Sequence, residues 1–394
     1  MNKPVTGNTV KVICIQRILP FYAVSVFEKL AQRSPIDFSL YFGAPSGNIP
    51  KLKSTEKLGQ VRFDYRKLLT ISFPVRFRKR LFPVVFNPSL LWYLMRDRPD
   101  VLICEGESNL LNNIFIIPYC ILTRTPYIWW GLGRVISRSE SPIRKIFRPL
   151  IRMMLRNAGA ILAYSTHAKQ FYVSEGASAD SAFVAFNSLD TTLIEESIAR
   201  FNTQVDDQRR ELGLDNMNIV LFVGALEPEK HIERLLLAFK KIQKPDRVLL
   251  IVGDGSERTV LERLAGQYEL QNVVFTGARV DDVSIYFLMA DLFVLPGLGG
   301  LAIQHAMAHG LPVITVPADG TESDLIHNGK NGYIVTDGED VDTIASHIDH
   351  ILSDTDLRDQ MSRCSHDLVA SSFNIKIMMD AVEEAIHHAV PDDS

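Results

Sequence analysis

The chain of 394 residues is poor in cysteine and has no long apolar run. No stretch approaches the roughly 18 apolar residues of a membrane-spanning helix, and the best candidate, residues 113–122, is interrupted by Pro118. The first residues have neither the apolar core nor the small-residue cleavage site of a secretory signal. The four cysteines form no Cys-x-x-Cys pair, which favours a reducing compartment and argues against a structural zinc site.

Signatures of several other protein classes are incomplete. The Gly-Asp-Gly turn at 253–255 is not the glycine pattern of a dinucleotide-binding loop. The Ser-Thr-His run at 165–167 has no matching acid and no nucleophile elbow. His347 and His350 are three residues apart, a spacing that could bind a metal, but exposed helix histidines are commoner. We therefore expect neither a metal nor a cofactor.

Acidic and basic residues are unevenly divided along the chain. Residues 1–200 carry 27 Lys and Arg against 14 Asp and Glu, whereas residues 201–394 carry 15 against 32. The basic residues gather with apolar ones at 76–82 and, at helical spacing, at 143–156. Such a surface suits an anionic membrane, and a solvated helix face over the core would give the same pattern. No nucleic-acid motif accompanies it, and the acidic half argues against a general polyanion binder.

Apolar strands alternate with helical segments along the whole chain. In the first half the clearest strands are at 10–16, 36–42, 101–103, 127–129, 160–164 and 182–186, and the clearest helices are at 24–32, 110–123, 143–157 and 167–174. A second series begins at 219 and continues to a helix at 355–373. This alternation predicts an α/β fold of parallel sheets with helices on both faces. The expected division is an N-terminal Rossmann-like domain at 1–200, a linker at 201–216, a C-terminal Rossmann-like domain at 217–373, and a helix and tail at 374–394 that return to the first domain.

The segment 296–310, PGLGGLAIQHAMAHG, is the most informative stretch of the sequence. It lies between two apolar runs, at 290–295 and 311–316, that are typical of buried parallel strands. A strand, a glycine turn and a helix start form a cradle for a phosphate, because small residues let the backbone approach the anion and the helix N-terminus attracts it. A simple packing turn between a strand and a helix would give the same residues.

Several motifs occur in a fixed order around this segment. VGALEPEKH at 223–231 resembles the VGRLxPEKG turn of family 4 glycosyltransferases, and IVGDGS at 251–256, VFTG at 274–277 and NGKNGY at 328–333 resemble the turns that accompany it. In the first half, PFY at 20–22, WGLG at 130–133 and NSLD at 187–190 resemble a branch of the same family with a PGxGGLAI donor loop. The resemblance covers nearly the whole chain. It implies the GT-B fold, with two Rossmann-like domains facing across a cleft, a nucleotide-sugar donor in the C-terminal domain, and transfer with retention of configuration and without a metal.

The resemblance also implies roles for individual residues. Glycosyl transfer from a nucleotide sugar expels a diphosphate, so the site needs cations and hydrogen-bond donors. Lys230 is the expected diphosphate cation and catalytic residue. The predicted donor-binding residues are Gly224, Lys230, Gly277, Gly300, Leu301, Ala302, His305 and Glu322, although Glu322 could equally serve as a carboxylate at a helix start. The predicted acceptor-binding residues are Arg17, Phe21, Tyr22 and Trp130.

The sequence departs from the family pattern at four positions. Ala225 stands where members usually have an arginine, and the two family glutamates fall on Gly297 and His305. His305 can make one hydrogen bond to the ribose but cannot accept two. Leu132 replaces the histidine of the family's WGHG motif. Arg134 or Glu107 is the candidate to supply the polar contact that Leu132 cannot make.

These observations predict a glycosyltransferase acting in bacterial-type surface polysaccharide or lipopolysaccharide synthesis. We expect a UDP- or GDP-sugar donor and a glycan acceptor, most simply a lipid-linked saccharide. The basic N-terminal half would then bind the inner face of the cell membrane from the cytoplasm, without nucleic acid. Two alternatives stay open. A catalytically inactive scaffold or partner-binding protein would explain Ala225, Gly297 and Leu132, and a sugar-nucleotide epimerase shares the fold but needs a carboxylate and histidine pairing that is not found here.

Overall fold

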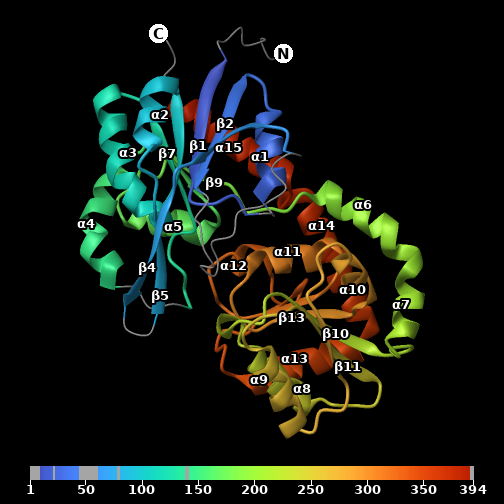
Figure 1. Ribbon diagram of the computed structural model, residues 1–394. Helices are drawn as coiled ribbons and strands as arrows, with labels where there is room; N and C mark the ends of the chain where they lie inside the picture. The colour runs from blue at the N-terminus through green and yellow to red at the C-terminus, as the bar shows by residue number, and fades with distance from the viewer. Residues whose placement is uncertain (1–8, 21–22, 44–60, 78–79, 138–141, 391–394) are drawn as a thin grey trace. The chain divides into compact units, whose positions relative to one another are not determined.

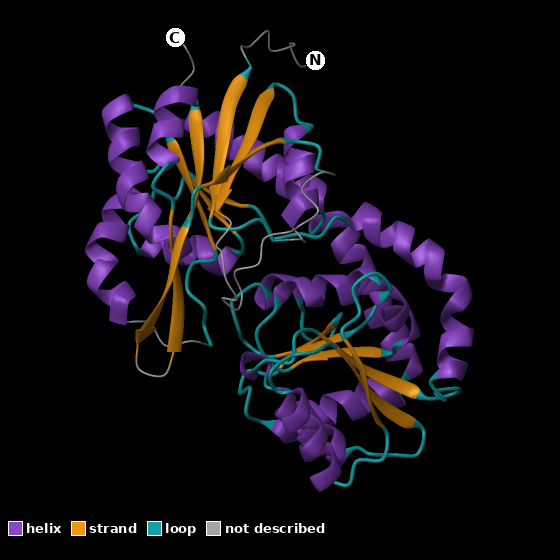
Figure 2. Ribbon diagram, viewed as in Figure 1, coloured by secondary structure: helices purple, strands orange, loops and turns teal. Residues whose placement is uncertain are grey.

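The computed structural model describes residues 9–20, 23–43, 61–77, 80–137 and 142–390. The chain divides into two compact units (Figures 1 and 2). Unit 1 comprises residues 1–134, 140–186 and 375–394, and unit 2 comprises residues 135–139 and 187–374. Among the described residues, no helix is both long and apolar enough to cross a membrane.

Unit 1 is built on a seven-stranded parallel sheet with the order β3-β2-β1-β6-β7-β8-β9. Its strands are β1 Val10–Gln16, β2 Ile36–Gly43, β3 Asp64–Leu68, β6 Val101–Glu105, β7 Tyr127–Gly131, β8 Ala160–Ala163 and β9 Ala182–Val184. Its helices are α1 Val24–Ala31, α2 Leu90–Asp97, α3 Leu110–Thr123, α4 Pro142–Arg156, α5 Thr166–Ser174 and α15 Ile375–Ala389. The strands β6, β7 and β8 are apolar and almost fully buried, as expected when helices cover both faces of a sheet, whereas the edge strand β3 is mostly polar.

Alternate residues of each strand of unit 1 enter two different cores. On one face Val12 and Cys14 pack with α1 and α15. On the other face Ile13 and Ile15 pack with α2, α3, α4 and α5. Figure 1 shows α2 and α3 on one side of the strands and α1 and α15 on the other. This division follows from the two-residue period of a strand.

The last helix of the chain is part of unit 1. Helix α15 packs against β8 and β9, and it is held to the turn after α1 by Arg33, whose guanidinium lies 2.7 Å from Asp380 and 3.0 Å from Glu383. The apolar face of α15, which includes Met378, Val382 and Ile386, is fully buried. Unit 1 therefore depends on a segment about 190 residues distant in the chain from its other elements.

Unit 2 contains a six-stranded parallel sheet with the order β12-β11-β10-β13-β14-β15. Its strands are β10 Asn218–Val223, β11 Arg247–Val252, β12 Val273–Gly277, β13 Leu292–Leu295, β14 Val313–Thr315 and β15 Gly332–Ile334. Its helices are α6 Thr191–Phe201, α7 Val205–Glu211, α8 Ile232–Lys241, α9 Arg258–Gln267, α10 Val283–Met289, α11 Gly300–Ala308, α12 Glu322–Leu325, α13 Val341–Ser353 and α14 Thr355–Ser372.

Three features differ from the predicted organisation. The boundary between the units falls at 186/187 rather than at 200. The predicted linker at 201–216 contains α7, which packs with α6 on α10 and so belongs to unit 2. An antiparallel hairpin, β4 Ile71–Phe77 and β5 Arg80–Phe86, was not predicted at all. The described parts of the basic segment 76–82, residues 76–77 and 80–82, belong to these two strands, whereas the expectation was an amphipathic surface without assigned structure.

Candidate functional site

Each parallel sheet has one point at which the strand order reverses. In unit 1 this switch point lies between β1 and β6, and in unit 2 it lies between β10 and β13. Open α/β sheets bind ligands outside the carboxyl ends of the strands at such points, because the two connecting loops diverge there to opposite faces. The loops after these four strands contain the predicted residues Arg17, Glu107, Lys230 and Gly300.

In unit 2 the loop after β10 is packed directly against the loop after β11. The amide of Gly224 donates to Val252 O at 3.0 Å, and that of Leu226 donates to Asp254 O at 3.0 Å. A Cβ on Gly253 would lie 1.8 Å from Gly224 O. Only glycine fits at this position, since no other residue allows the two main chains to approach so closely. The GDG turn is therefore a support for the 224–230 loop.

Lys230 joins this loop to the turn after β13. Its ammonium donates to Leu298 O, and the amide of Leu298 donates to Glu229 O at 3.0 Å. A Cβ on Gly297 would lie 2.5 Å from Glu229 O and 2.6 Å from the carbonyl carbon of Lys230. The absence of a side chain at Gly297, one of the departures from the family pattern, is thus what lets the two loops meet.

The N-terminus of α11 lies beside the ammonium of Lys230. A Cβ on Gly299 would be 2.5 Å from Lys230 Nζ, and Gly299 provides no side-chain cap to the helix. The first amides of a helix, here those of Gly300, Leu301 and Ala302, have no partner within the helix and carry partial positive charge. A lysine at this end opposes the usual distribution of charge on a helix, and an anion bound between them would relieve the repulsion.

Glu322 orders the loop at residues 318–321, which approaches the N-terminus of α11. Its carboxylate accepts from the amide of Ala318 at 2.9 Å and from that of Gly320 at 3.0 and 3.1 Å. The residue is 1 % exposed, and burial raises its pKa against these hydrogen bonds. Thr321, which precedes Glu322, lies against the start of α11. A Cβ on Gly300 would be 2.4 Å from Thr321 Oγ1. Glu322 therefore orders the loop that meets the start of α11.

The remaining predicted donor-binding residues are His305, in the second turn of α11, and Gly277, at the end of β12. The ring of His305 packs within α10 and α11, 4.5 Å from the centroid of Phe287 and 5.0 Å from that of His309. Burial, reinforced by His309, lowers the pKa of His305 to about 3. Gly277 ends β12, two strands from β10, and its carbonyl accepts from Gly253 N at 2.9 Å. The contact of His305 with a ribose stays a prediction.

At the switch point of unit 1, Arg17 is held by Glu105. Arg17 follows β1, and both its amide and its Nε donate to the Glu105 carboxylate at 2.7 Å. Ser108 Oγ donates to the same carboxylate at 2.5 Å. The Arg17 side chain is 24 % exposed. The structure thus places a guanidinium held by Glu105 after β1, at the carboxyl edge of this sheet, and its contact with an acceptor stays a prediction.

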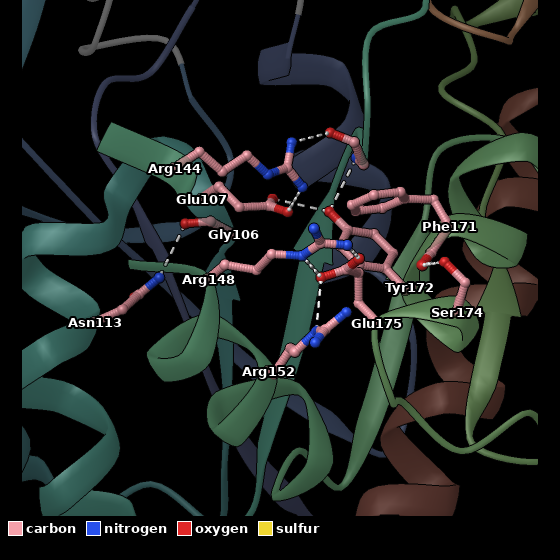
Figure 3. Close-up of polar contacts among 11 residues, drawn as sticks. Gly106, Glu107, Asn113, Arg144, Arg148, Arg152, Phe171, Tyr172, Ser174 and Glu175 are labelled. Carbon is pink, nitrogen blue, oxygen red and sulfur yellow. Dashed lines mark hydrogen bonds and ion pairs between the residues drawn. The ribbon is translucent and has the colours of Figure 1, made fainter. Parts of the chain in front are cut away.

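Glu107, two residues farther on, is surrounded by protein partners. Arg144 Nη2 donates to Glu107 Oε1 at 2.9 Å, and the hydroxyl of Tyr172 donates to Oε2 at 3.0 Å. Figure 3 shows these three side chains converging from three segments of unit 1. Burial raises the pKa of Glu107, although the charge of Arg144 opposes this shift. Both carboxylate oxygens are engaged within the protein.

The other predicted residues of unit 1 fare differently. Trp130 is 3 % exposed and packs with Phe27 and Tyr164 in the core. A strand that is covered on both faces buries both sets of side chains, and the acceptor contact of Trp130 stays a prediction. Arg134 is exposed on the loop after β7. Phe21 and Tyr22 lie outside the described residues.

The structure adds one residue that motif reasoning missed. Gln304 of α11 is 4 % exposed. Its side chain donates to Asn187 O at 2.7 Å and accepts from Leu189 N at 3.1 Å. It therefore fixes the NSLD segment to the helix that begins at Gly300. A polar residue flanked by apolar ones in a buried helix was the available signal.

The two sheets and their switch points define the GT-B fold. The described architecture is most simply compared with the Anabaena protein HepE in its complex with UDP, which superposes with a TM-score of 0.75 at 18 % identity and covers 96 % of this chain and 99 % of that one. At this identity the likeness establishes the fold.

The match to a known family model lies within unit 2. Residues 204–366 match the family model described as "Glycosyl transferases group 1". The chain is 32 % identical over 182 residues to spore coat protein SA of Bacillus subtilis, a match that covers 43 % of this chain and about half, 48 %, of that protein. It is 28 % identical over 363 residues to sulfoquinovosyl transferase SQD2 of Arabidopsis thaliana, covering 88 % of this chain and 68 % of the relative. The family match is thus confined to a segment of unit 2.

Proposed function

We propose that this protein transfers a sugar from a nucleoside-diphosphate sugar to a glycan acceptor. The observation that carries the proposal is the group formed by Lys230, the 297–299 turn and the start of α11 at the switch point of unit 2. A primary ammonium and a set of helix amides converge there on one place, which is the arrangement that binds the diphosphate of a leaving nucleotide.

In this proposal the donor is held chiefly by backbone. The amides of Gly300, Leu301 and Ala302 bind the distal phosphate, and Lys230 neutralises charge that develops as the diphosphate departs. A UDP-bound structural neighbour and the sulfoquinovosyl transferase relative are consistent with a nucleotide-sugar donor, and UDP- and GDP-sugars are the candidates. The resemblance to family 4 further suggests retention of configuration without a metal ion.

We also propose that the acceptor is lipid-linked and that unit 1 binds an anionic membrane through α4. One side of this helix carries a hollow of about 590 Å³ lined by Lys145, Arg148, Arg152 and Arg156. Arg148 and Arg152 also contact Glu175, at 2.5 and 3.1 Å. Beside the hollow, the side chain of Ile146 is 74 % exposed. Cations flanked by exposed apolar side chains bind phosphate headgroups and insert into the interface. Such a protein would act at the cytoplasmic face of the membrane in surface polysaccharide or lipopolysaccharide synthesis.

Flotation with liposomes tests the membrane proposal. We expect binding to vesicles that contain anionic phospholipid at low salt, weaker binding at high salt, and little binding to neutral vesicles. Replacing Lys145 and Arg156 together by alanine should reduce the bound fraction severalfold, whereas Lys244→Ala in unit 2 should not. Equal flotation with neutral and anionic vesicles would rule out a headgroup interaction.

Mass-spectrometric detection of transfer tests the activity itself. The assay combines the protein, a panel of UDP- and GDP-sugars, and a membrane lipid extract as acceptor. Ala225 and Leu132 favour a second candidate, a scaffold that binds a nucleotide sugar or a partner without turnover. Nucleotide binding with no product from any donor would support that candidate, and conversion of a donor without an acceptor would point to an epimerase.

A further inference from the structure

The main chain of Gly133 is held at both of its polar groups. Its amide donates to Tyr172 OH at 2.9 Å, and its carbonyl accepts from Arg144 Nη1 at 3.3 Å. Since Tyr172 and Arg144 each donate to Glu107, the four residues form a closed ring of hydrogen bonds. Its side chains come from the turn after β6, from α4 and from α5.

The ring is closely packed around the loop after β7. Tyr172 is completely buried, and a Cβ on Gly131 would lie 2.2 Å from its hydroxyl. Gly133 has φ of +72°, and a Cβ there would approach Ala168 to 3.1 Å. The guanidinium of Arg144 lies 4.7 Å from the ring centroid of Phe171. A loop of three residues is therefore fixed by glycine contacts and by the ring together.

A loop connection does not by itself need such an arrangement. Burying a carboxylate and a tyrosine hydroxyl is unfavourable unless each is fully hydrogen-bonded, and here two of the four hydrogen bonds of the ring end on the main chain of Gly133. Leu132, between the two held glycines, is partly exposed at the carboxyl edge of the sheet. The internal use of both Glu107 oxygens also makes this residue a poor candidate for direct proton transfer.

We propose that Glu107, Tyr172 and Arg144 are positioning residues that set the 131–133 loop for the glycan acceptor, an inference that rests on the proposed transferase function. The loop, and not the Glu107 carboxylate, then contacts the acceptor. This assignment replaces the expected catalytic role of Glu107. It predicts that weakening the ring affects acceptor use and leaves the donor site in unit 2 unchanged.

Tyr172→Phe is the most direct test, because it removes one hydroxyl and leaves the aromatic side chain otherwise unchanged. We expect exchange of the Gly133 amide to become about tenfold faster, the equivalent of one lost hydrogen bond. In transfer assays, kcat/KM for the acceptor should fall about tenfold while KM for the donor stays unchanged. Tyr119→Phe is the matched control, since this hydroxyl donates to Leu94 O at 3.0 Å in the same unit. The control should lower thermal stability without altering the kinetic constants.

The two measurements separate the ring from the activity. Unchanged exchange at Gly133 would overturn the ring, whatever the protein does. Faster exchange with unchanged acceptor kinetics would show that the ring is structural only and would overturn the positioning role. If the wild-type protein transfers no sugar, the proposed function fails and the positioning role fails with it, while the exchange result still decides the ring. Glu107→Gln, which cannot accept from both donors without rearrangement, provides a second variant with the same expected pattern.

Discussion

The two switch points of this molecule differ in the kind of contact that holds their loops. In unit 2, main chain packs on main chain: Gly297 meets Glu229 and Lys230, and Gly253 meets Gly224, at distances that exclude any side chain. In unit 1, side chains bind side chains: Glu105 holds Arg17, and Glu107 holds Tyr172 and Arg144. The first edge is a set of glycine turns, and the second is a set of ion pairs and hydrogen bonds.

The difference suggests a division of labour. Backbone amides and one ammonium bind the diphosphate, the group that all nucleoside diphosphates share, because they interact with its negative charge. A side-chain network can change with each acceptor, since its members come from separate elements. Substitutions should consequently act in different ways at the two edges: those in unit 2 by steric exclusion, those in unit 1 by loss of hydrogen bonds.

Gly297→Ala should have the largest effect. If the protein tolerated this change, substitutions in unit 2 would not act by steric exclusion. The added methyl group would lie 2.5 Å from Glu229 O, so the 297–299 turn must move away from Lys230. We expect nucleoside-diphosphate affinity to fall by more than about a hundredfold, with a loss of about 1–3 kcal/mol in unfolding free energy. Calorimetric titration with UDP and GDP measures the first quantity, and urea unfolding measures the second.

The control for this variant is Gly266→Ala. Gly266 lies inside α9, and a Cβ there would have no atom within 4 Å. This change should stabilise the protein by about 0.5–1 kcal/mol, because alanine is the better helix former, and it should leave nucleotide affinity unchanged. Equal behaviour of the two variants would refute the backbone cradle.

Lys230→Ala should have the next largest effect. Loss of a charge-assisted contact with the diphosphate is worth about 1.5–3 kcal/mol, which corresponds to an affinity about ten to a hundred times lower. Donor affinity and initial rate are to be measured after thermal melting has established that the variant folds. Lys241→Ala, which removes an exposed lysine paired with Asp342 at 2.5 Å, should change neither. A folded Lys230→Ala protein with wild-type affinity would remove the lysine from the site.

A further prediction concerns stability in acid, to which two buried histidines of unit 2 should contribute. Burial lowers the pKa of His305 to about 3 and that of His309 to about 4. The unfolded chain binds these protons near pH 6.5, so the stabilisation is complete above that pH and decreases as the pH falls from 6.5 towards 4. Each ring should contribute about 1.4 kcal/mol per pH unit in this range.

Urea unfolding at pH 7.5, 6.5 and 5.5 checks this dependence. The variant with both His305→Gln and His309→Gln should lose stability less steeply than the wild type. His366→Gln is the control, because its imidazole is 57 % exposed, and this variant should follow the wild type. Parallel slopes in all three proteins would mean that the two rings are not kept neutral by the fold.

The elements of the fold were largely predictable from the sequence. The strand at 10–16 and the helix at 110–123 have the predicted bounds, since both are apolar and periodic. The hairpin was missed because Pro74 and Pro83, which face each other across β4 and β5, interrupt the pattern of a regular strand. Helix α2 was also missed, although α1, which has the same length of 8 residues, was predicted.

The site of unit 2 was more predictable than that of unit 1. The loop around Lys230 and the glycines at 297–300 are contiguous motifs, and contiguous residues stay together on folding. Lys230 and Leu298 are 68 positions apart, but each belongs to a motif that the sequence shows by itself. Tyr172 and Arg144, the partners of Glu107, belong to no such motif. Trp130 is a related case: the sequence locates it near a strand end, but only packing determines that Phe27 and Tyr164 lie against its ring.

The central claim is that unit 2 binds a nucleoside diphosphate at its backbone cradle. Amide exchange of the full chain with and without saturating UDP or GDP tests it most directly. We expect slower exchange at residues 224–230 and 297–302 with at least one nucleotide, and no change at the 131–133 loop of unit 1. Absence of protection in 224–230 and 297–302 with every nucleotide would contradict it, as would protection confined to unit 1.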